Sequence, residues 1–248
     1  MYLTIRGLVL RVTDYNDRDA LVTLLTQNHG RLTVKARGLR RKNSPLTAAC
    51  QLLVLSEFTL FEYKGMYTVN EAHSIELFQG LRRDLQKLTL GTYFAQVAEV
   101  LSQEDLPNPE LLSLVLNSLF ALSRLSVSEW QVKAAYELRC ACIAGYTPDL
   151  SACHVCGNTA ADRFDISAGR LECRYCRSSE SDGLRMPLSP GMLDAMRYIV
   201  SCDPKRLLCF QTGSEAMDRL AQLTETYLTR QLERGFSTRD FYKSLLIE

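Results

Sequence analysis

The first 80 residues show the short alternation of apolar and polar positions that is typical of β-strands. In the segment 32–37, for example, every second residue is apolar and the residues between them are polar or basic. Polar or glycine-containing turns separate such segments, and no convincing long helical pattern lies between them. Five strands in so short a stretch predict a small closed or nearly closed barrel. The expected strands are 2–13, 20–26, 32–37, 52–63 and 66–75.

After Gly80 the apolar residues recur with the period of a helix. One expected helix opens with Ser126 and Glu129 spaced as a capping box, and it ends at Gly145. Another begins at Ser189, which is an N-cap residue followed by proline. The remaining helices are expected at 81–101, 111–120, 214–234 and in a short segment after Thr238.

The order of these elements predicts a protein of the α+β class. We expect a barrel domain at 1–80 and a helical domain at 81–248, with an irregular insertion at about 150–185. The composition is that of a globular protein, with 46% hydrophobic and 23% charged residues in 248. It excludes an intrinsically disordered or collagen-like chain.

The sequence contains no pattern that predicts export or membrane insertion. The N-terminal segment lacks the order of charged, apolar and small residues that a secretory signal requires. No stretch approaches the roughly 18 uninterrupted apolar residues of a membrane helix. We therefore expect a cytoplasmic protein with no membrane partner.

Four of the nine cysteines form two Cys-x-x-Cys pairs, Cys153 with Cys156 and Cys173 with Cys176. Sixteen residues separate the pairs, a spacing that is typical of a tetrathiolate zinc site. Two tight turns can point four sulfur atoms at one ion, and four thiolates leave no open position for a substrate. We therefore expect one structural Zn²⁺ ion per chain, with buried free cysteines or a redox pair as the alternative. The other cysteines are expected to be small core residues: Cys50, Cys140, Cys142, Cys202 and Cys209.

The net charge is only +1, but the positive charge is concentrated in one segment, 31–42, which contains no acidic residue. On a barrel, this strand and the loop 38–44 would form a groove able to follow a phosphate backbone. The alternative is a solvated edge whose charges discourage strand pairing. Tyr15, Tyr63 and Tyr67 are candidates for stacking on bases, with packing as their alternative role. The basic residues are Arg31, Lys35, Arg37, Arg40, Arg41 and Lys42.

The sequence carries no recognised catalytic motif. It has no phosphate-binding Gly-x4-Gly-Lys-Ser/Thr loop, no Gly-x-Ser-x-Gly and no His-Glu-x-x-His. We therefore expect that the protein is not an enzyme.

The order of the parts resembles the RecO family of bacterial recombination mediators, across essentially the whole chain. The matching segments are TIRGLVLRVTDYNDRDALVTLLTQNHGRLTVKARGLRRKNS, the helical centre, the CHVC…CRYC insertion and the closing LERGFSTRDF. The most specific of them is HGRLTVKARGLRRKNS. The closing FSTRDF departs from the family because it has phenylalanine where a basic residue is common.

This resemblance implies a five-stranded OB-fold, a helical domain and, in many members, a zinc site of four cysteines. It implies binding to single- and double-stranded DNA, annealing of complementary strands, and loading of RecA together with RecR and the single-stranded-DNA-binding protein (SSB). SSB would contribute its C-terminal tail, and RecA would be an indirect partner. The location would be the bacterial cytoplasm, in association with the nucleoid. The family's DNA-contacting residues match Lys35, Arg37, Arg40, Arg41 and Lys42.

Two other functions fit parts of the sequence. The cysteine pairs also suit a zinc-ribbon RNA-modifying or transcription-associated protein. A protein scaffold would need neither DNA nor ATP, and its basic segment would only be solvated. A strand-annealing assay with and without ATP separates these alternatives.

Overall fold

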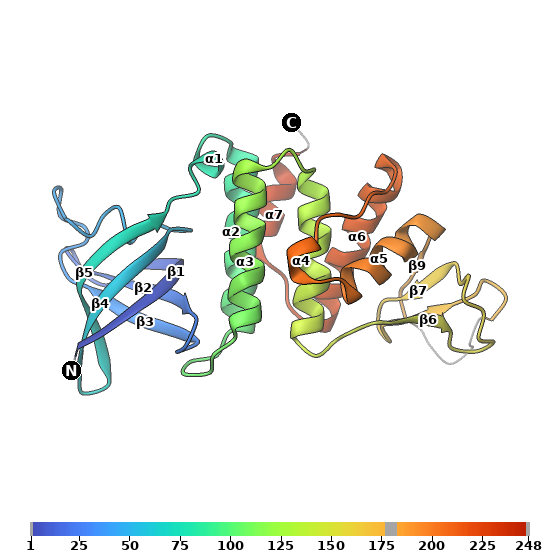
Figure 1. The fold of residues 1–248 in the computed structure, drawn as a ribbon, viewed down its shortest axis with the longest axis horizontal. Coiled ribbons are helices and arrows are strands. Elements are labelled where there is room, and N and C mark those ends of the chain that lie inside the picture. Colours follow the sequence, from blue (N-terminus) through green and yellow to red (C-terminus); the bar gives the residue numbers. More distant parts are fainter. Residues whose placement is uncertain (1, 177–182, 247–248) are drawn as a thin grey trace. The chain divides into compact units, whose positions relative to one another are not determined.

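Five strands close into a barrel in the N-terminal part of the protein, in a computed structural model that describes residues 2–176 and 183–246 (Figure 1). Neighbouring strands around the barrel follow the order β1-β2-β3-β5-β4. Every pair is antiparallel except β3 with β5, which is parallel. The predicted barrel is confirmed. Its strands are β1 (Tyr2–Asp14), β2 (Ala20–Thr26), β3 (Arg31–Ala36), β4 (Leu55–Tyr63) and β5 (Met66–Glu76).

The long strand β1 closes the barrel because it pairs with two neighbours. Its first residues pair with β4, and the residues from Gly7 onward pair with β2. The register shifts between Val9 and Arg11, which is the local irregularity that bends a strand. Val9 also exchanges backbone hydrogen bonds with Leu53 and Val54, at 2.9 and 3.0 Å. The fully buried interior includes Val9, Val22, Leu24, Val34, Phe58 and Leu60.

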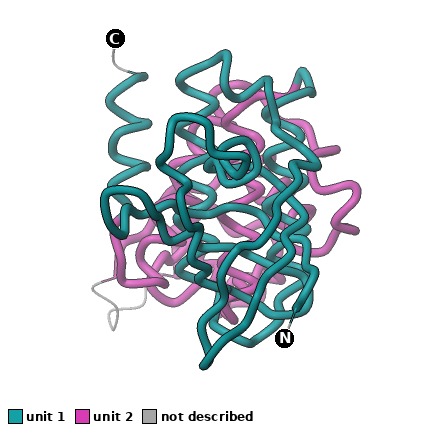
Figure 2. Tube along the Cα trace, turned by 90° about the vertical axis from the view of Figure 1, so that its left-hand side faces the viewer, with its two compact units in different colours: residues 1–126, 236–248 teal, residues 127–235 magenta. Residues whose placement is uncertain are grey.

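Contacts divide the chain into two units, which Figure 2 colours separately: residues 1–126 with 236–248, and residues 127–235. In the first unit the barrel is followed by helices. Asp84 caps the second of them, since its carboxylate accepts hydrogen bonds from two backbone N–H groups, and so it divides the predicted helix 81–101 in two. The helices are α1 (Gln79–Arg82), α2 (Leu85–Leu101), α3 (Pro109–Arg124) and α7 (Ser237–Ser244).

The C-terminal helix α7 packs against α2. The ring of Phe236 lies edge-on to Tyr93, with centroids 5.5 Å apart, and both side chains are fully buried. Thr238 donates a hydrogen bond to Gln96. The last residues of the chain therefore complete the first unit, and the predicted domain boundary at residue 80 stays a prediction.

The second unit combines helices with a small sheet of order β6-β8-β7-β9. Its predicted N-cap at Ser189 is confirmed, because the hydroxyl accepts from the Met192 N–H. The predicted capping box is wrong: the N-cap is Ser128, and Ser126 lies outside the helix. No described helix has the length and apolar character that a membrane span requires. The elements are α4 (Glu129–Ile143), β6 (Asp149–Cys153), β7 (Arg163–Asp165), β8 (Arg170–Glu172), β9 (Arg185–Pro187), α5 (Pro190–Ser201), the 3-10 helix η1 (Pro204–Arg206) and α6 (Ser214–Gln231).

A buried ionic network joins α4 to α6. The Lys133 side chain is 1% exposed, and its Nζ lies 2.9 Å from Glu137 Oε1 and 2.8 Å from Glu225 Oε2. Thr224 donates a hydrogen bond to the other oxygen of Glu137. Buried charges of this kind require partners on every side, so the network fixes how the two helices meet.

The turn between β2 and β3 brings barrel backbone against the loop that joins α2 to α3. Gly30 adopts a left-handed conformation with φ of 59°, and the Arg31 N–H donates to the Gln103 carbonyl at 2.9 Å. A Cβ on Gly30 would lie only 2.3 Å from the carbonyl oxygen of Leu106. Only glycine therefore permits this approach.

We predict that Gly30→Ala lowers the free energy of unfolding by about 2–3 kcal/mol, because it adds both backbone strain and a collision. Gly65→Ala is the matched control: Gly65 also has a positive φ of 75°, but a Cβ there would meet no atom within 4 Å. The control should lose only about 1 kcal/mol. Urea unfolding of the full chain measures both values, and equal losses would contradict the proposed collision.

Candidate nucleic-acid interface and metal centre

The four paired cysteines lie together in the second unit. Their sulfur atoms are all within 4.8 Å of one another, an arrangement that could hold a metal ion. Cys153 ends β6 and Cys173 directly follows β8, and each begins a tight turn that carries its partner. The Cys156 and Cys173 sulfur atoms are 3.9 Å apart, far longer than a disulfide bond, and all four cysteines are free.

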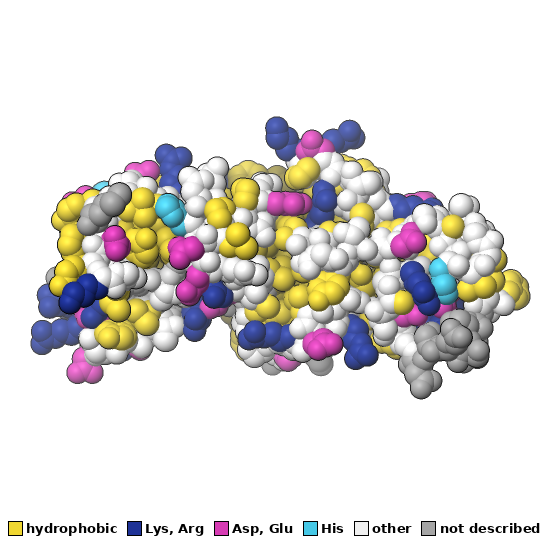
Figure 3. All heavy atoms as spheres, turned by 90° about the horizontal axis from the view of Figure 1, so that it is seen from below, with side chains coloured by type: hydrophobic (Ala, Val, Ile, Leu, Met, Phe, Trp, Pro, Cys, Tyr) yellow, Lys and Arg dark blue, Asp and Glu magenta, His cyan; other side chains and the backbone are white. Residues whose placement is uncertain are grey.

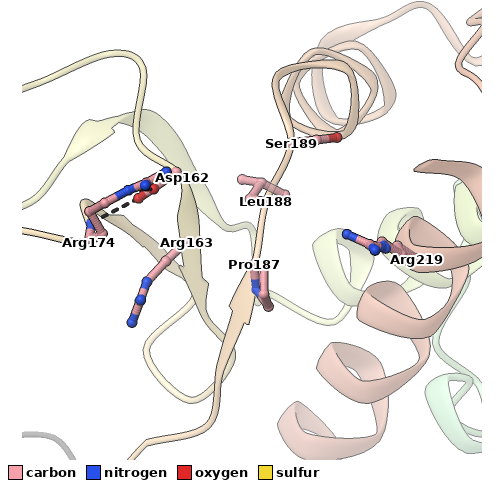
Figure 4. A pocket seen from close by; sticks show the side chains of 7 residues that line it. All are labelled: Asp162, Arg163, Arg174, Pro187, Leu188, Ser189 and Arg219. Atoms are coloured by element: carbon pink, nitrogen blue, oxygen red, sulfur yellow. Dashed lines mark hydrogen bonds and ion pairs between the residues drawn. The ribbon is translucent and has the colours of Figure 1, made fainter. Parts of the chain in front are cut away.

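Hydrogen bonds hold the two cysteine turns in place. The Gly157 N–H donates to the Cys153 carbonyl at 2.8 Å, with Gly157 in a left-handed conformation. Arg174, inside the second turn, donates from its backbone N–H and its guanidinium to the Asp162 carboxylate. Figure 4 shows this pair at one side of an open pocket that Arg163 and Arg219 also line. The turns are therefore fixed by the surrounding chain as well as by the cysteines.

The local electrostatics favour one thiolate but not four. Burial opposes ionisation of Cys153, yet the backbone N–H groups of Cys156, Val155 and Cys173 outweigh it and lower the pKa of Cys153 to about 6. Burial and the neighbouring thiols raise the pKa of Cys173 to about 11. Since adjacent negative charges repel, ionisation of all four groups requires a cation among them.

The predicted basic segment lies on β3 and the loop that follows it, and the structure gives three of its six residues acidic partners. Arg31 donates to the Glu99 carbonyl at 3.0 Å and lies 3.8 Å from Glu104, so it contacts the helical part of the first unit. The Nζ of Lys35 is 3.2 Å from Asp19 Oδ2. The guanidinium of Arg40 lies 3.3 Å from Asp14 Oδ2 and donates to the Asn16 carbonyl.

The other three basic residues, Arg37, Arg41 and Lys42, are exposed and form no ion pair with any described residue. Arg18, in the loop between β1 and β2, is exposed in the same way, and its carbonyl accepts from the Arg40 N–H. Sequence reasoning missed Arg18, because two aspartates lie within two positions of it in the chain. Lysine and arginine side chains project from the barrel at the left-hand edge of Figure 3.

The three candidate tyrosines have different environments. Tyr67 is half-buried and packs against the barrel interior, which favours its packing role. Tyr15 and Tyr63 are exposed. A lysine accompanies each of them: the Lys35 Nζ lies 4.4 Å from the Tyr15 ring centroid, and Lys64 lies 5.3 Å from that of Tyr63. Tyr15 lies in the loop between β1 and β2, and Tyr63 ends β4 at the turn into β5. These are the two loops at which OB-fold barrels bind oligonucleotides.

Asp19 ties the basic loop to the loop between β1 and β2. One carboxylate oxygen accepts from the Gly38 N–H at 2.9 Å, and the other contacts Asn16 and Lys35. The Gly38 N–H, the Asn16 amide and the Lys35 ammonium hold the pKa of Asp19 below its ordinary value, although burial opposes them. The basic loop therefore begins from a fixed point.

Comparisons with known proteins cover both units. Residues 1–78 match the family model "Recombination protein O N terminal", and residues 82–240 match "Recombination protein O C terminal". The chain is 34% identical to "DNA repair protein RecO" of Acetivibrio thermocellus, over 98% of this chain and 97% of that protein. Proteins of the same name match from Alkaliphilus metalliredigens (26%, over 99% and 100%) and Bacillus subtilis (28%, over 89% and 86%).

We predict that the basic loop loosens at acidic pH. Because the pKa of Asp19 is lowered in the folded chain, its contribution is complete above the ordinary aspartate value of about 3.9 and is lost as the pH falls through the lower folded value. The hydrogen-exchange protection of the Gly38 amide should therefore decrease on acidification.

Asp19→Asn should lower this protection at neutral pH and remove its pH dependence. Asp17→Asn is the control, since it removes the neighbouring carboxylate, which forms no hydrogen bond with a described residue. Unchanged protection of Gly38 in the Asp19 variant would contradict the assigned role.

Proposed function

Because this chain belongs to the recombination protein O family of DNA repair proteins, we propose that its barrel binds the phosphate backbone of DNA through Arg37, Arg41 and Lys42. One observation carries the proposal: these three cations are exposed, lack acidic partners among the described residues and follow one another on a loop that Asp19 anchors. An arginine or lysine without an internal partner does not have to break an ion pair before it binds a phosphate. It gives up only water and salt ions, so binding carries little desolvation cost.

The remaining predicted basic residues have supporting roles in this proposal. Lys35 and Arg40 add positive potential, but Asp19 and Asp14 offset part of it. Arg31 connects the barrel to the helices that follow it. Phosphate contacts carry no base information, and both single- and double-stranded DNA present phosphates. The loop can therefore bind both forms.

We propose that the protein anneals complementary strands without nucleotide hydrolysis and is not an enzyme. Positive charge on the barrel lowers the repulsion between two phosphate backbones, which lets complementary bases find their register. With RecR, the protein would help to load RecA on SSB-coated DNA, in the bacterial cytoplasm and in association with the nucleoid. The alternative of a zinc-ribbon RNA-modifying or transcription-associated protein has no support among the relatives, which are named as DNA repair proteins.

The acidic, phenylalanine-ended tail of SSB is proposed to bind the helical part of the protein. Such a peptide needs a cation beside an exposed apolar surface. Arg124 and Phe120 offer this combination on α3, with the guanidinium 5.6 Å from the centroid of an exposed ring, although Glu76 offsets part of the charge through an ion pair with Arg124 at 2.8 Å. Arg139 is less suitable, because its guanidinium donates to the carbonyls of Val200 and Cys202.

We further propose that the four cysteines hold one structural Zn²⁺ ion. At a bond length of ~2.3 Å, tetrahedral geometry places the sulfur atoms of a tetrathiolate site about 3.8 Å apart. The 3.9 Å between the sulfur atoms of Cys156 and Cys173 fits this value. The ion would stabilise the small sheet of the second unit, which is too small to bury much apolar surface of its own.

For DNA binding, we predict that Arg37→Ala/Arg41→Ala flattens the dependence of log K on log salt for a single-stranded oligonucleotide by up to about 1.4. Each phosphate neutralised on a single strand contributes about 0.7 to that slope. Affinity should fall alike for oligonucleotides of different sequence. Arg40→Ala should flatten the slope less, because Asp14 already pairs with Arg40.

Arg230→Ala/Arg234→Ala is the matched control for this titration. It removes the same charge from exposed positions at the end of α6, in the second unit, and it should leave the slope unchanged. Circular dichroism confirms folding of each variant. Equal slopes for the wild type and the folded Arg37/Arg41 variant would refute the proposed site.

For the metal centre, we predict one zinc ion per chain in protein purified under reducing conditions. Cys173→Ser should release the ion and lower the midpoint of thermal unfolding, whereas the salt slope of DNA binding should not change. Cys209→Ser is the control: the prediction that Cys209 is a core residue is wrong, because it is an exposed free cysteine, and it lies outside the cluster. Elemental analysis gives the stoichiometry, and wild-type protein without zinc would overturn the assignment.

A further inference from the structure

A line of outward-facing residues crosses four strands of the barrel at one level. Tyr2 on β1 is directly opposite Phe61 on β4, and Phe61 is opposite Thr68 on β5. Thr68 in turn is paired with Lys35 on β3. Since neighbouring strands are about 4.8 Å apart, Phe61 lies two strand spacings, about 10 Å, from Lys35. Lys35 is covered by the ring of Tyr15, so aromatic rings lie at both ends of the line.

Tyr2 and Phe61 form an exposed aromatic pair at one end of this line. Their ring centroids are 5.4 Å apart, and the residues are 63% and 40% exposed. Tyr63 and Met66, which are paired with each other next along β4 and β5, are exposed as well. Single exposed apolar residues are normal, but a contiguous group of large ones on a sheet face marks an interaction surface.

The helices of the first unit contact β1 beyond its bend, away from this pair. Arg11 forms an ion pair with Glu99 of α2 at 2.8 Å, and the turn at Gly30 contacts the loop after α2. The first contact lies where β1 pairs with β2, and the second lies at the turn between β2 and β3. The Tyr2 end of β1, beside β4 in Figure 1, pairs with β4 alone.

We propose that Tyr2 and Phe61 stack on the bases of single-stranded DNA whose phosphates are bound by the basic loop. This inference rests on the proposed DNA-binding function of the barrel. Three features favour nucleic acid as the occupant: the aromatic rings, the continuity of the line to Lys35, and the absence of an acidic residue among the four residues of the line. Lys64 adds positive charge near the pair, with its ammonium 5.3 Å from the centroid of the Tyr63 ring.

Stacking on Tyr2 and Phe61 would make the barrel bind single strands more tightly than duplexes. Bases in a duplex are already stacked and paired, so only a single strand can offer a free base face to the rings. The basic loop alone cannot make that distinction, because both forms present phosphates. The aromatic pair therefore gives the barrel a preference for single strands that does not depend on base sequence.

The test uses the full chain and the variant Tyr2→Leu/Phe61→Leu, which keeps apolar side chains but removes both rings. Binding is measured to an oligo(dT), to an oligonucleotide of the same length with abasic sugars, and to a duplex. We expect the variant to bind oligo(dT) about tenfold more weakly, with an unchanged salt slope. It should bind the abasic strand and the duplex like the wild type.

Tyr146→Leu is the matched control, because Tyr146 is exposed to a similar degree as Phe61 but follows α4 in the second unit. It should bind all three ligands like the wild type. An equal loss of affinity for the oligo(dT) and for the abasic strand would overturn the inference. Unchanged oligo(dT) binding together with altered self-association in sedimentation would overturn it as well. If oligo(dT) binding depends on Arg37 and Arg41 but not on the two rings, the stacking inference is rejected and the proposed function of the basic loop still stands.

Discussion

Closure of the barrel through the single strand β1 is the constraint on which the proposed DNA site depends. One end of β1 pairs with β4 and places Tyr2 beside Phe61. The other end pairs with β2 and sets the position of the loop that contains Asp19. The bend near Val9 satisfies both pairings at once, and the buried interior holds it in place. Aromatic and basic groups that are far apart in sequence therefore share one rigid support, which is what a binding surface on a barrel requires.

Neighbouring carboxylates decide which of the six clustered cations are available to a ligand. Lys35 and Arg40 have aspartate partners and Arg31 has a glutamate, whereas no described acidic residue pairs with Arg37, Arg41 or Lys42. The network around Lys133 shows the opposite case, in which burial forces every charge to find an internal partner. Charge counts along a sequence cannot separate these cases, because they depend on which strands and loops meet.

Sequence patterns located most elements and the cysteine cluster, since local period and spacing determine them. They failed where contacts between residues far apart in the sequence determine the structure. β4 begins at Leu55 and not at Leu52, because Leu53 takes a left-handed conformation and bonds back to Val9. Neither the parallel pairing of β6 with β8 nor the burial of Lys133 could be predicted from the sequence. The opposition of Tyr2 and Phe61 follows from strand register, which no local pattern in the two segments reveals.

The discontinuous first unit also sets the order of events during translation. All the barrel strands lie within residues 2–76, so the barrel can close early, whereas α7, which packs against α2, is made only after the whole second unit. At about 5–20 residues per second, synthesis of the intervening second unit leaves the face of α2 that receives Phe236 uncovered for on the order of 10 s. The nascent chain can thus close the barrel that carries the proposed DNA site well before α7 seals the adjoining helical core.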